Sequence, residues 1–199
     1  MSTKVAKPET TFEIVPEGTY IGRTYRFIHL GTQSSMWQGK ETLKKKILIS
    51  FELPLKKTVF REEDGEQPFT VHQRFTLSMF LTSELRKMVE SILGKKMIDD
   101  EAYDFELEDL VGKACMVSIV HNDGYANIKS IVPLPEGITC PEPINEPMIL
   151  NFTDQWSEEK FESLSKNVQE AIKKSPEYYD MKNAVIAEPN ENSVDDIPF

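Results

Sequence analysis

Residues 69–77 read FTVHQRFTL, and apolar side chains alternate with polar ones along this stretch. One phase holds Phe69, Val71, Phe75 and Leu77, and the other holds Thr70, His72, Arg74 and Thr76. A period of two is typical of a β-strand that buries one face. The stretch therefore predicts a strand with an apolar inner face and a polar, partly cationic outer face.

Four further strands are predicted around this one, over residues 19–30, 45–53, 114–121 and 125–132. All are rich in β-branched and aromatic residues. The second has an inner phase of Ile47, Ile49, Phe51 and Leu53 and an outer phase of Lys44, Lys46, Ser50 and Glu52, and Leu48 breaks this pattern. Asn122-Asp123-Gly124 predicts a tight hairpin between the last two strands. Residues 31–42 and 56–68 are expected to be loops, and Gly22 a bulge or bend.

Two helices are predicted. The first follows an N-cap at Thr82-Ser83-Glu84 and stops at Gly94, with apolar residues at helical spacing between them. The second begins after Ser157 and ends at Pro176. Five prolines within residues 133–147 predict a boundary between the strands and this last helix.

The order of three strands, a helix and two strands is typical of the OB-fold, a five-stranded Greek-key barrel with a helix between strands 3 and 4. An SH3-like barrel and an α+β sandwich are alternatives. A chain of 199 residues suits one such domain with extensions. We expect a flexible N-terminus (1–15), the OB domain (16–135), a Pro-rich linker (136–156), a C-terminal helix (157–175) and a disordered acidic tail (176–199).

Charge is distributed unevenly along the chain. The formal net charge is −10, yet residues 21–57 hold eight bases and two acids, a net charge of +6. Residues 183–199 hold four acids and no base. This asymmetry predicts nucleic-acid contact at one end of the chain and an interaction tail at the other.

OB-folds bind ligands on the outer face of strands 2 and 3 and on the adjoining loops. On such a surface cations neutralise phosphates, and aromatic rings stack on the bases of a single strand without reading its sequence. The residues that we expect to bind DNA are Arg23, Tyr25, Arg26, Trp37, Lys40, Lys44, Lys46, His72, Arg74, Tyr125 and Lys129.

The chain ends in Asp195-Asp196-Ile197-Pro198-Phe199. Such a segment has the properties of a peptide ligand: Phe199 can fill an apolar pocket, and the carboxylates can meet basic residues. Pro198 restrains the backbone and lowers the entropy cost of docking. These five residues are the predicted partner-binding site.

This tip resembles the acidic tip of bacterial single-stranded DNA-binding proteins, which recruits replication and repair partners. Residues 16–135 are similar instead to phage-encoded single-stranded DNA-binding OB-fold proteins. The resemblance rests on Gly18-Thr19-Tyr20, Leu30-Gly31-Thr32-Gln33, Phe51-Glu52-Leu53-Pro54, Leu110-Val111-Gly112-Lys113 and Tyr125-Ala126-Asn127-Ile128 before Pro133-Leu134.

The resemblance implies single-stranded DNA binding in phage DNA replication, recombination and repair, in the cytoplasm of a bacterial host. It also implies a tail that recruits replication proteins and competes with DNA for the basic groove. Two departures limit the resemblance: it does not imply the bacterial tetramer, and the helix over residues 157–174 is not part of the bacterial pattern. That helix would pack on the barrel, mediate a homodimer or order only with a partner.

Nothing in the sequence predicts an enzyme, a cofactor or a metal. The acids of residues 99–109 follow one another as on a solvated face, whereas a metal nuclease needs converging carboxylates. The three histidines lack metal-ligand spacing, Cys115 and His121 are too far apart along one strand to form a dyad, and there is no P-loop or GxGxxG.

The remaining composition favours a cytoplasmic protein without a membrane span. The chain has two cysteines, no apolar run near 18 residues and no apolar signal segment at its start. The alternative function is a protein-interaction adaptor, or an inhibitor of host replication factors, that acts through the C-terminal tip.

Overall fold

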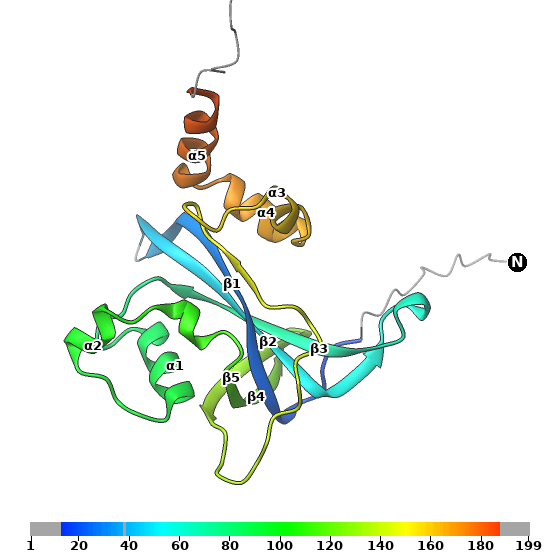
Figure 1. The fold of residues 1–199 in the computed structure, drawn as a ribbon. Coiled ribbons are helices and arrows are strands. Elements are labelled where there is room, and N and C mark those ends of the chain that lie inside the picture. The colour runs from blue at the N-terminus through cyan, green and yellow to red at the C-terminus, as the bar shows by residue number, and fades with distance from the viewer. Residues whose placement is uncertain (1–12, 38, 188–199) are drawn as a thin grey trace, which may run out of the picture.

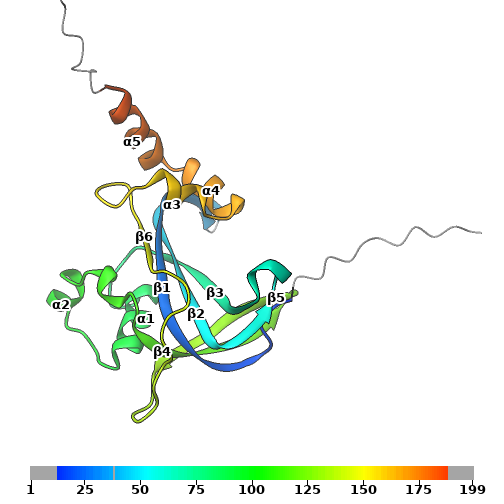
Figure 2. The same cartoon turned by 45° about the vertical axis from the view of Figure 1, so that its right-hand side comes forward.

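The computed structural model describes residues 13–37 and 39–187. Its strands are β1 (Gly18–Trp37), β2 (Lys40–Val59), β3 (Glu66–Thr76), β4 (Ala114–Asn122), β5 (Tyr125–Pro133) and β6 (Met148–Leu150). The first five form a curved antiparallel sheet in the order β3-β2-β1-β4-β5, and the short β6 runs parallel to β1 (Figures 1 and 2).

The prediction of a mainly-β chain is confirmed, but the sheet is not closed. It has six strands rather than five, and in the described part of the chain no backbone ladder joins β3 to β5. The closed five-stranded barrel is therefore not shown.

The β1–β2 hairpin is longer than the sequence predicts. Residues 31–37 and 40–42, expected to be loop, continue the two strands, with Ser35 paired to Thr42. Side-chain hydrogen bonds cross this extension: Ser34 Oγ donates to Glu41 Oε1 at 2.6 Å, and the hydroxyl oxygens of Ser35 and Thr42 lie 3.1 Å apart. Polar cross-strand pairs of this kind stabilise a hairpin without a buried face. The sequence therefore shows no apolar alternation from which these strand ends could be predicted.

The β1 bulges also lie elsewhere than predicted. The register shifts occur between Thr24 and Arg26 and between His29 and Gly31, not at Gly22. A Cβ at Gly22 would approach Val117 Cγ2 to 2.6 Å. Gly22 therefore allows close contact between β1 and β4 rather than a bend.

The main core lies on the inner face of the sheet. Its strand residues include Phe27, Ile47, Ile49, Phe51, Leu53, Phe69, Val71 and Phe75. Helix α1 (Glu84–Leu93) covers one end of this core with Leu85, Met88, Val89 and Ile92. Ser83 Oγ caps its first turn by accepting from the Arg86 N–H, and Gly94 ends it at φ +67°.

Short elements fill the connections. A turn of 3-10 helix, η1 (Glu62–Asp64), precedes β3. Helix α2 (Asp99–Tyr103) and a second such turn, η2 (Leu107–Leu110), lie between α1 and β4.

Residues 134–147, which we call the strap, follow the sheet instead of forming a free linker. The fully buried carboxylate of Glu52 accepts from the N–H groups of Ile144 (3.0 Å) and Asn145 (2.6 Å). Arg23 donates to the carbonyl oxygen of Pro141 at 2.6 Å. The prolines mark an irregular segment, but these bonds to β1 and β2 fasten it to the strand domain.

Replacing Glu52 is expected to loosen the strap. In Glu52→Ala the two strap N–H groups lose their acceptor, which should lower the free energy of unfolding by about 1–3 kcal/mol. Glu52→Gln keeps one acceptor oxygen and should lose less. Urea denaturation of both variants measures this, and a wild-type midpoint for Glu52→Ala would show that these bonds do not hold the strap.

The C-terminal helical region differs from the prediction of one helix over 157–175 and a disordered tail from 176. It contains α3 (Glu158–Glu162), α4 (Lys166–Lys173) and α5 (Pro176–Ala187), and Pro176 begins a helix rather than ending the structure. Residues 188–199 lie outside the described residues.

Helices α3 and α4 pack on the outer face of this same chain's sheet and form a second core. Its members are Ile28, Leu30, Leu48, Leu150, Phe161, Leu164, Val168 and Ile172. Leu48, which breaks the inner phase of its strand, thus belongs to a different core. In Figure 2 these helices lie above β6, and the end of the strap reaches them, because Glu146 and Pro147 line one cavity together with Glu159 of α3.

Candidate nucleic-acid interface

Several of the predicted cations share the outer face of β1, β2 and β3. The register aligns Arg26, Ser50 and His72 in one row and Ile28, Leu48 and Arg74 in the next. The following row pairs Lys46 with Thr76, and Lys44 lies two residues further along the same face. We call Lys44, Lys46, His72 and Arg74 the cationic face.

The four members differ in how freely they can move. The side chains of Lys44, His72 and Arg74 are exposed, whereas Lys46 is half-buried and donates from Nζ to Thr76 Oγ1 at 2.8 Å. Partial burial, and then the neighbouring charge of Lys44, lowers the pKa of Lys46. The positive charges of Lys44 and Lys46 repel each other unless an anion lies near them. The cationic face is therefore a suitable place for phosphates.

His72 adds a titratable group to this face. Desolvation by the surrounding side chains, and then the charge of Arg74, lowers its pKa. The imidazole is therefore neutral near pH 7 in the absence of an anion.

The β4–β5 hairpin brings an aromatic ring to the same region. Asp123 (φ +51°) and Gly124 (φ +79°) form the two-residue turn that their sequence predicts. Tyr125 follows this turn with 72% of its surface exposed. It lines a cavity of about 410 Å³ between β3 and β5, whose wall also includes Thr70, His72 and Asn127.

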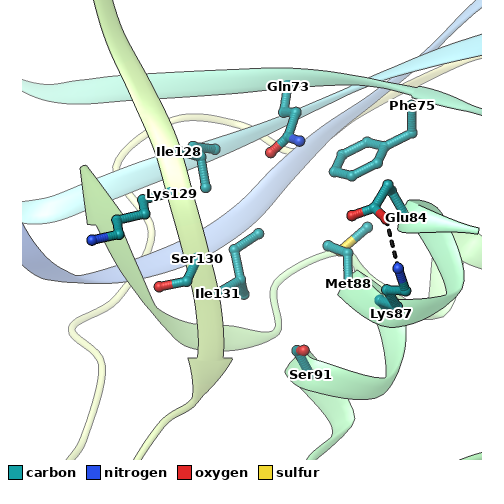
Figure 3. A pocket seen from close by; sticks show the side chains of 10 residues that line it. All are labelled: Gln73, Phe75, Glu84, Lys87, Met88, Ser91, Ile128, Lys129, Ser130 and Ile131. Carbon is teal, nitrogen blue, oxygen red and sulfur yellow. Dashed lines mark hydrogen bonds and ion pairs between the residues drawn. The ribbon is translucent and has the colours of Figure 1, made fainter. Parts of the chain in front are cut away.

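Lys129 lies further along β5, on the wall of a second cavity of about 220 Å³ between β3, β5 and α1. Figure 3 shows its side chain pointing away from the Glu84–Lys87 ion pair on α1, whose Oε1 and Nζ atoms are 2.7 Å apart. Lys129 is thus available to a ligand at the edge of this gap, apart from the cationic face.

Other predicted DNA-binding residues have structural partners or are covered. Arg23 donates to the carbonyl oxygens of Gly112 (2.8 Å) and Pro141. Tyr25 is buried, its pKa is raised mainly by that burial, and Arg26 lies over its ring at 5.0 Å. Arg23 and Tyr25 are thus engaged within the fold, and their contact with DNA stays a prediction. Half-buried Arg26 lines a cavity at the border of the helices.

The remaining predicted residues lie near the hairpin end or beyond what is described. Lys40 is exposed at the start of β2. The side chain of Trp37 and the whole tip Asp195–Phe199 lie outside the described residues.

The structure adds one aromatic residue that the sequence reasoning missed. Phe60 is exposed, lines the cavity beside Tyr125, and makes an edge-to-face contact with Phe69 at 5.2 Å between ring centroids. The apolar pair Val59-Phe60 inside a charged stretch was the available signal, since large exposed apolar groups often mark binding sites.

Cys115 and His121, two side chains of types that can take part in catalysis, have partners or are buried. Burial raises the pKa of the Cys115 thiol to about 12, so almost no thiolate forms near neutral pH. The Nε2 atom of His121 lies 2.8 Å from the carbonyl oxygen of Val15. Within residues 13–37 and 39–187, no three or more His, Cys, Asp or Glu side chains are grouped to hold a metal ion. No helix in this part of the chain has the length and apolar character needed to span a membrane.

Comparisons with protein families, with curated proteins and with solved structures find no match to this chain.

Proposed function

We propose that this protein binds single-stranded DNA without reading its sequence, as part of phage DNA replication, recombination or repair. The observation that carries the proposal is the cationic face on β2 and β3, which lies beside the exposed ring of Tyr125 in a chain of net charge −10. Cations spaced along two strands can follow a phosphate backbone, and a neighbouring aromatic ring can stack on an unpaired base. A duplex offers no such base.

An OB-fold is the architecture that best accommodates this function. The order β3-β2-β1-β4-β5 is that of a five-stranded Greek-key barrel opened between its third and fifth strands. The two free edges line the same cavities, and α1 lies between β3 and β4 in the chain. These features support a partly open barrel whose ligand face includes strands 2 and 3.

The C-terminal helices restrict the path of the DNA. They cover Ile28 and Leu30 on β1 and Leu48 on β2, so a strand cannot cross β1 or this part of β2. The accessible path passes Lys44 and Lys46 at the uncovered end of β2 and then follows β3, past Arg74, to the cavity beside Tyr125. The tip Asp195–Phe199 would recruit replication proteins and, being acidic, would compete with DNA for this path.

Fluorescence anisotropy with labelled oligo(dT) and with duplex DNA tests the proposal on the full chain. We expect binding to the single strand only. If three cations neutralise phosphates, log Kd should change with log salt at a slope of about 2 in magnitude. Absence of oligo(dT) binding at low salt would contradict the proposal and favour the adaptor that acts through the C-terminal tip.

The pH dependence of binding should report on His72. Lowering the pH from about 7.5 to about 5.5 protonates the imidazole and adds a positive charge to the cationic face. Because a bound phosphate would raise the lowered pKa, oligo(dT) affinity should rise by up to about tenfold across this range. His72→Gln should remove most of the increase; the same pH response in this variant would assign it to another group.

A further inference from the structure

A cavity of about 390 Å³ lies between β1, the end of the strap and α3. Each of these parts contributes to its wall, with Arg26 from β1, Glu146 from the strap and Lys160 from α3. A volume of about 300–1,000 Å³ is usual for a site that binds a small molecule. This cavity shares no residue with the one beside Tyr125, so it is a second place where a ligand can be held.

Arg26 is a half-buried cation without a partner in this cavity. Its Nε atom is buried and has no hydrogen-bond partner among the residues that the structure describes, and no carboxylate of this part of the chain forms an ion pair with it. The guanidinium carbon lies 5.0 Å from the centroid of the Tyr25 ring, so the ring supports the cation but supplies no negative charge. A partly buried charge without a counter-charge is unfavourable, and an anion in the cavity would remove this cost.

Lys160 adds a second cation to the same wall, and β6 places it near Arg26. Met148 of β6 is the register partner of Arg26. The carbonyl oxygen of the next residue, Ile149, accepts from Lys160 Nζ at 3.3 Å. Ser157 lines the cavity as well, and its Oγ accepts from the backbone N–H of Lys160 at 3.3 Å, so its hydroxyl hydrogen can be donated to a ligand. The wall thus offers donors from one arginine, one lysine and one serine.

Two acidic residues also line the cavity, but they do not pair with these cations. Glu146 and Glu159 are exposed, and neither carboxylate forms an ion pair with Arg26 or Lys160. The free N–H groups of the two cations are therefore left to a ligand. Since the two carboxylates repel an anion, removing one of them is itself a test of the site.

We infer that this cavity binds a phosphate monoester, with the phosphate on Arg26 and Lys160. Near pH 7 such a group has a charge of about −1.5 to −2 and three strong acceptor oxygens, which match the two cations and the three donor side chains. The planar guanidinium can donate to two of these oxygens at once. A carboxylate or a phosphodiester offers one negative charge and two free oxygens, so a terminal phosphate fits this wall better. This inference does not depend on the proposed function.

Isothermal titration calorimetry of the full chain with thymidine 5′-monophosphate, at low salt, tests it. We expect the monophosphate to bind and thymidine, which lacks only the phosphate, not to bind. Arg26→Gln and Lys160→Gln should each weaken binding by at least about tenfold, because each removes a charged hydrogen-bond donor. Glu159→Gln changes an exposed residue without risk to the fold and should strengthen binding, because it removes a repelling charge. Lys166→Gln is the matched control, since Lys166 is exposed on α4 and does not line the cavity.

A double variant, Lys44→Gln with Lys46→Gln, separates this site from the cationic face. It should bind the monophosphate like the wild type. If it loses binding while Lys160→Gln retains it, the phosphate lies on the cationic face and the inference is wrong. Unchanged affinity in Arg26→Gln, Lys160→Gln and Glu159→Gln would overturn it as well.

Two kinds of molecule carry a terminal phosphate, a free nucleotide and the 5′ end of a DNA strand. Anisotropy with oligo(dT) labelled at its 3′ end, with and without a 5′-phosphate, distinguishes them. A higher affinity for the phosphorylated strand that is lost in Lys160→Gln would assign the site to a DNA end, whereas equal affinities together with monophosphate binding would assign it to a free nucleotide. No binding of the monophosphate and no preference for the phosphorylated strand would overturn the inference, even if the 5′-hydroxyl strand binds as the proposed function requires.

Discussion

Reversing the charge of Lys44, Lys46 and Arg74 together is expected to weaken oligo(dT) binding by at least ~100-fold at low salt. Every cation that neutralises a phosphate releases a counterion from the DNA, and this release is the main source of sequence-independent affinity. Substitution by Glu removes three such contacts and places three anions along the proposed path. The remaining affinity should also depend less on salt, because fewer counterions are released.

The control for this variant must match its overall charge. Substituting Glu for Lys95, Lys166 and Lys174 changes the net charge by the same amount at exposed positions that do not belong to β2 or β3. If long-range attraction alone were responsible, both triple variants would lose affinity equally. A loss confined to Lys44, Lys46 and Arg74 would locate the binding on the cationic face, whereas equal affinities for the wild type and this variant would exclude it.

Tyr125 extends the same test to the bases. Tyr125→Ala should weaken oligo(dT) binding by about 1–3 kcal/mol without changing the salt dependence, because stacking releases no counterions. Tyr125→Phe keeps the ring and should bind like the wild type. If Tyr125→Ala also binds like the wild type, the bases do not stack on this ring.

The inner core could be predicted from the sequence, because the alternation of apolar and polar residues along a strand shows which side chains face it. Alternation in residues 45–53 and 69–77 places Ile47, Phe51 and Phe75 toward the core, where the structure has them. Leu48 follows a second rule: a continuous apolar run such as Ile47-Leu48-Ile49 is typical of a strand covered on both faces. The run therefore indicates a cover on the outer face of the sheet, where α3 and α4 pack, rather than an irregularity in the strand.

The residues of the candidate site were harder to predict. Their exposure depends on the β-bulges in β1 and on hydrogen-bond partners that lie far away along the chain. The shift between Thr24 and Arg26 changes the phase of β1, and Tyr25 becomes buried beneath Arg26. From the sequence, Arg23 is a candidate DNA contact. In the structure it donates to the carbonyl oxygen of Pro141 in the strap, a partner that lies far away along the chain. Between Lys46 and Leu53 the β2–β3 ladder has no register shift, and Lys44, His72 and Arg74 are exposed as their alternation predicts.

The second core should be separable from the first, and Phe161 is the residue that tests this. Phe161 is buried between Trp156, at 5.2 Å between ring centroids, and Tyr178, at 5.8 Å, and it belongs to the cluster that α3 and α4 form on Leu48. Phe161→Ala should cost about 3–5 kcal/mol within this small cluster. Because this cluster is small and shares no residue with the inner core, the helices should detach before the sheet unfolds.

Hydrogen exchange resolved along the chain distinguishes detachment from a uniform loss of stability. In Phe161→Ala we expect amides of α3 and α4 to lose protection while amides of β1 to β5 retain it, and Trp156 emission to shift to the red as its ring becomes solvated. Phe161→Leu is the matched control, since it keeps most of the apolar volume and should shift neither signal strongly. Equal loss of protection in the helices and the strands would show that both cores unfold as one unit. Detachment would instead uncover Ile28, Leu30 and Leu48 beside Arg74, so oligo(dT) binding by this variant would show whether the helices limit the length of DNA that the sheet can hold.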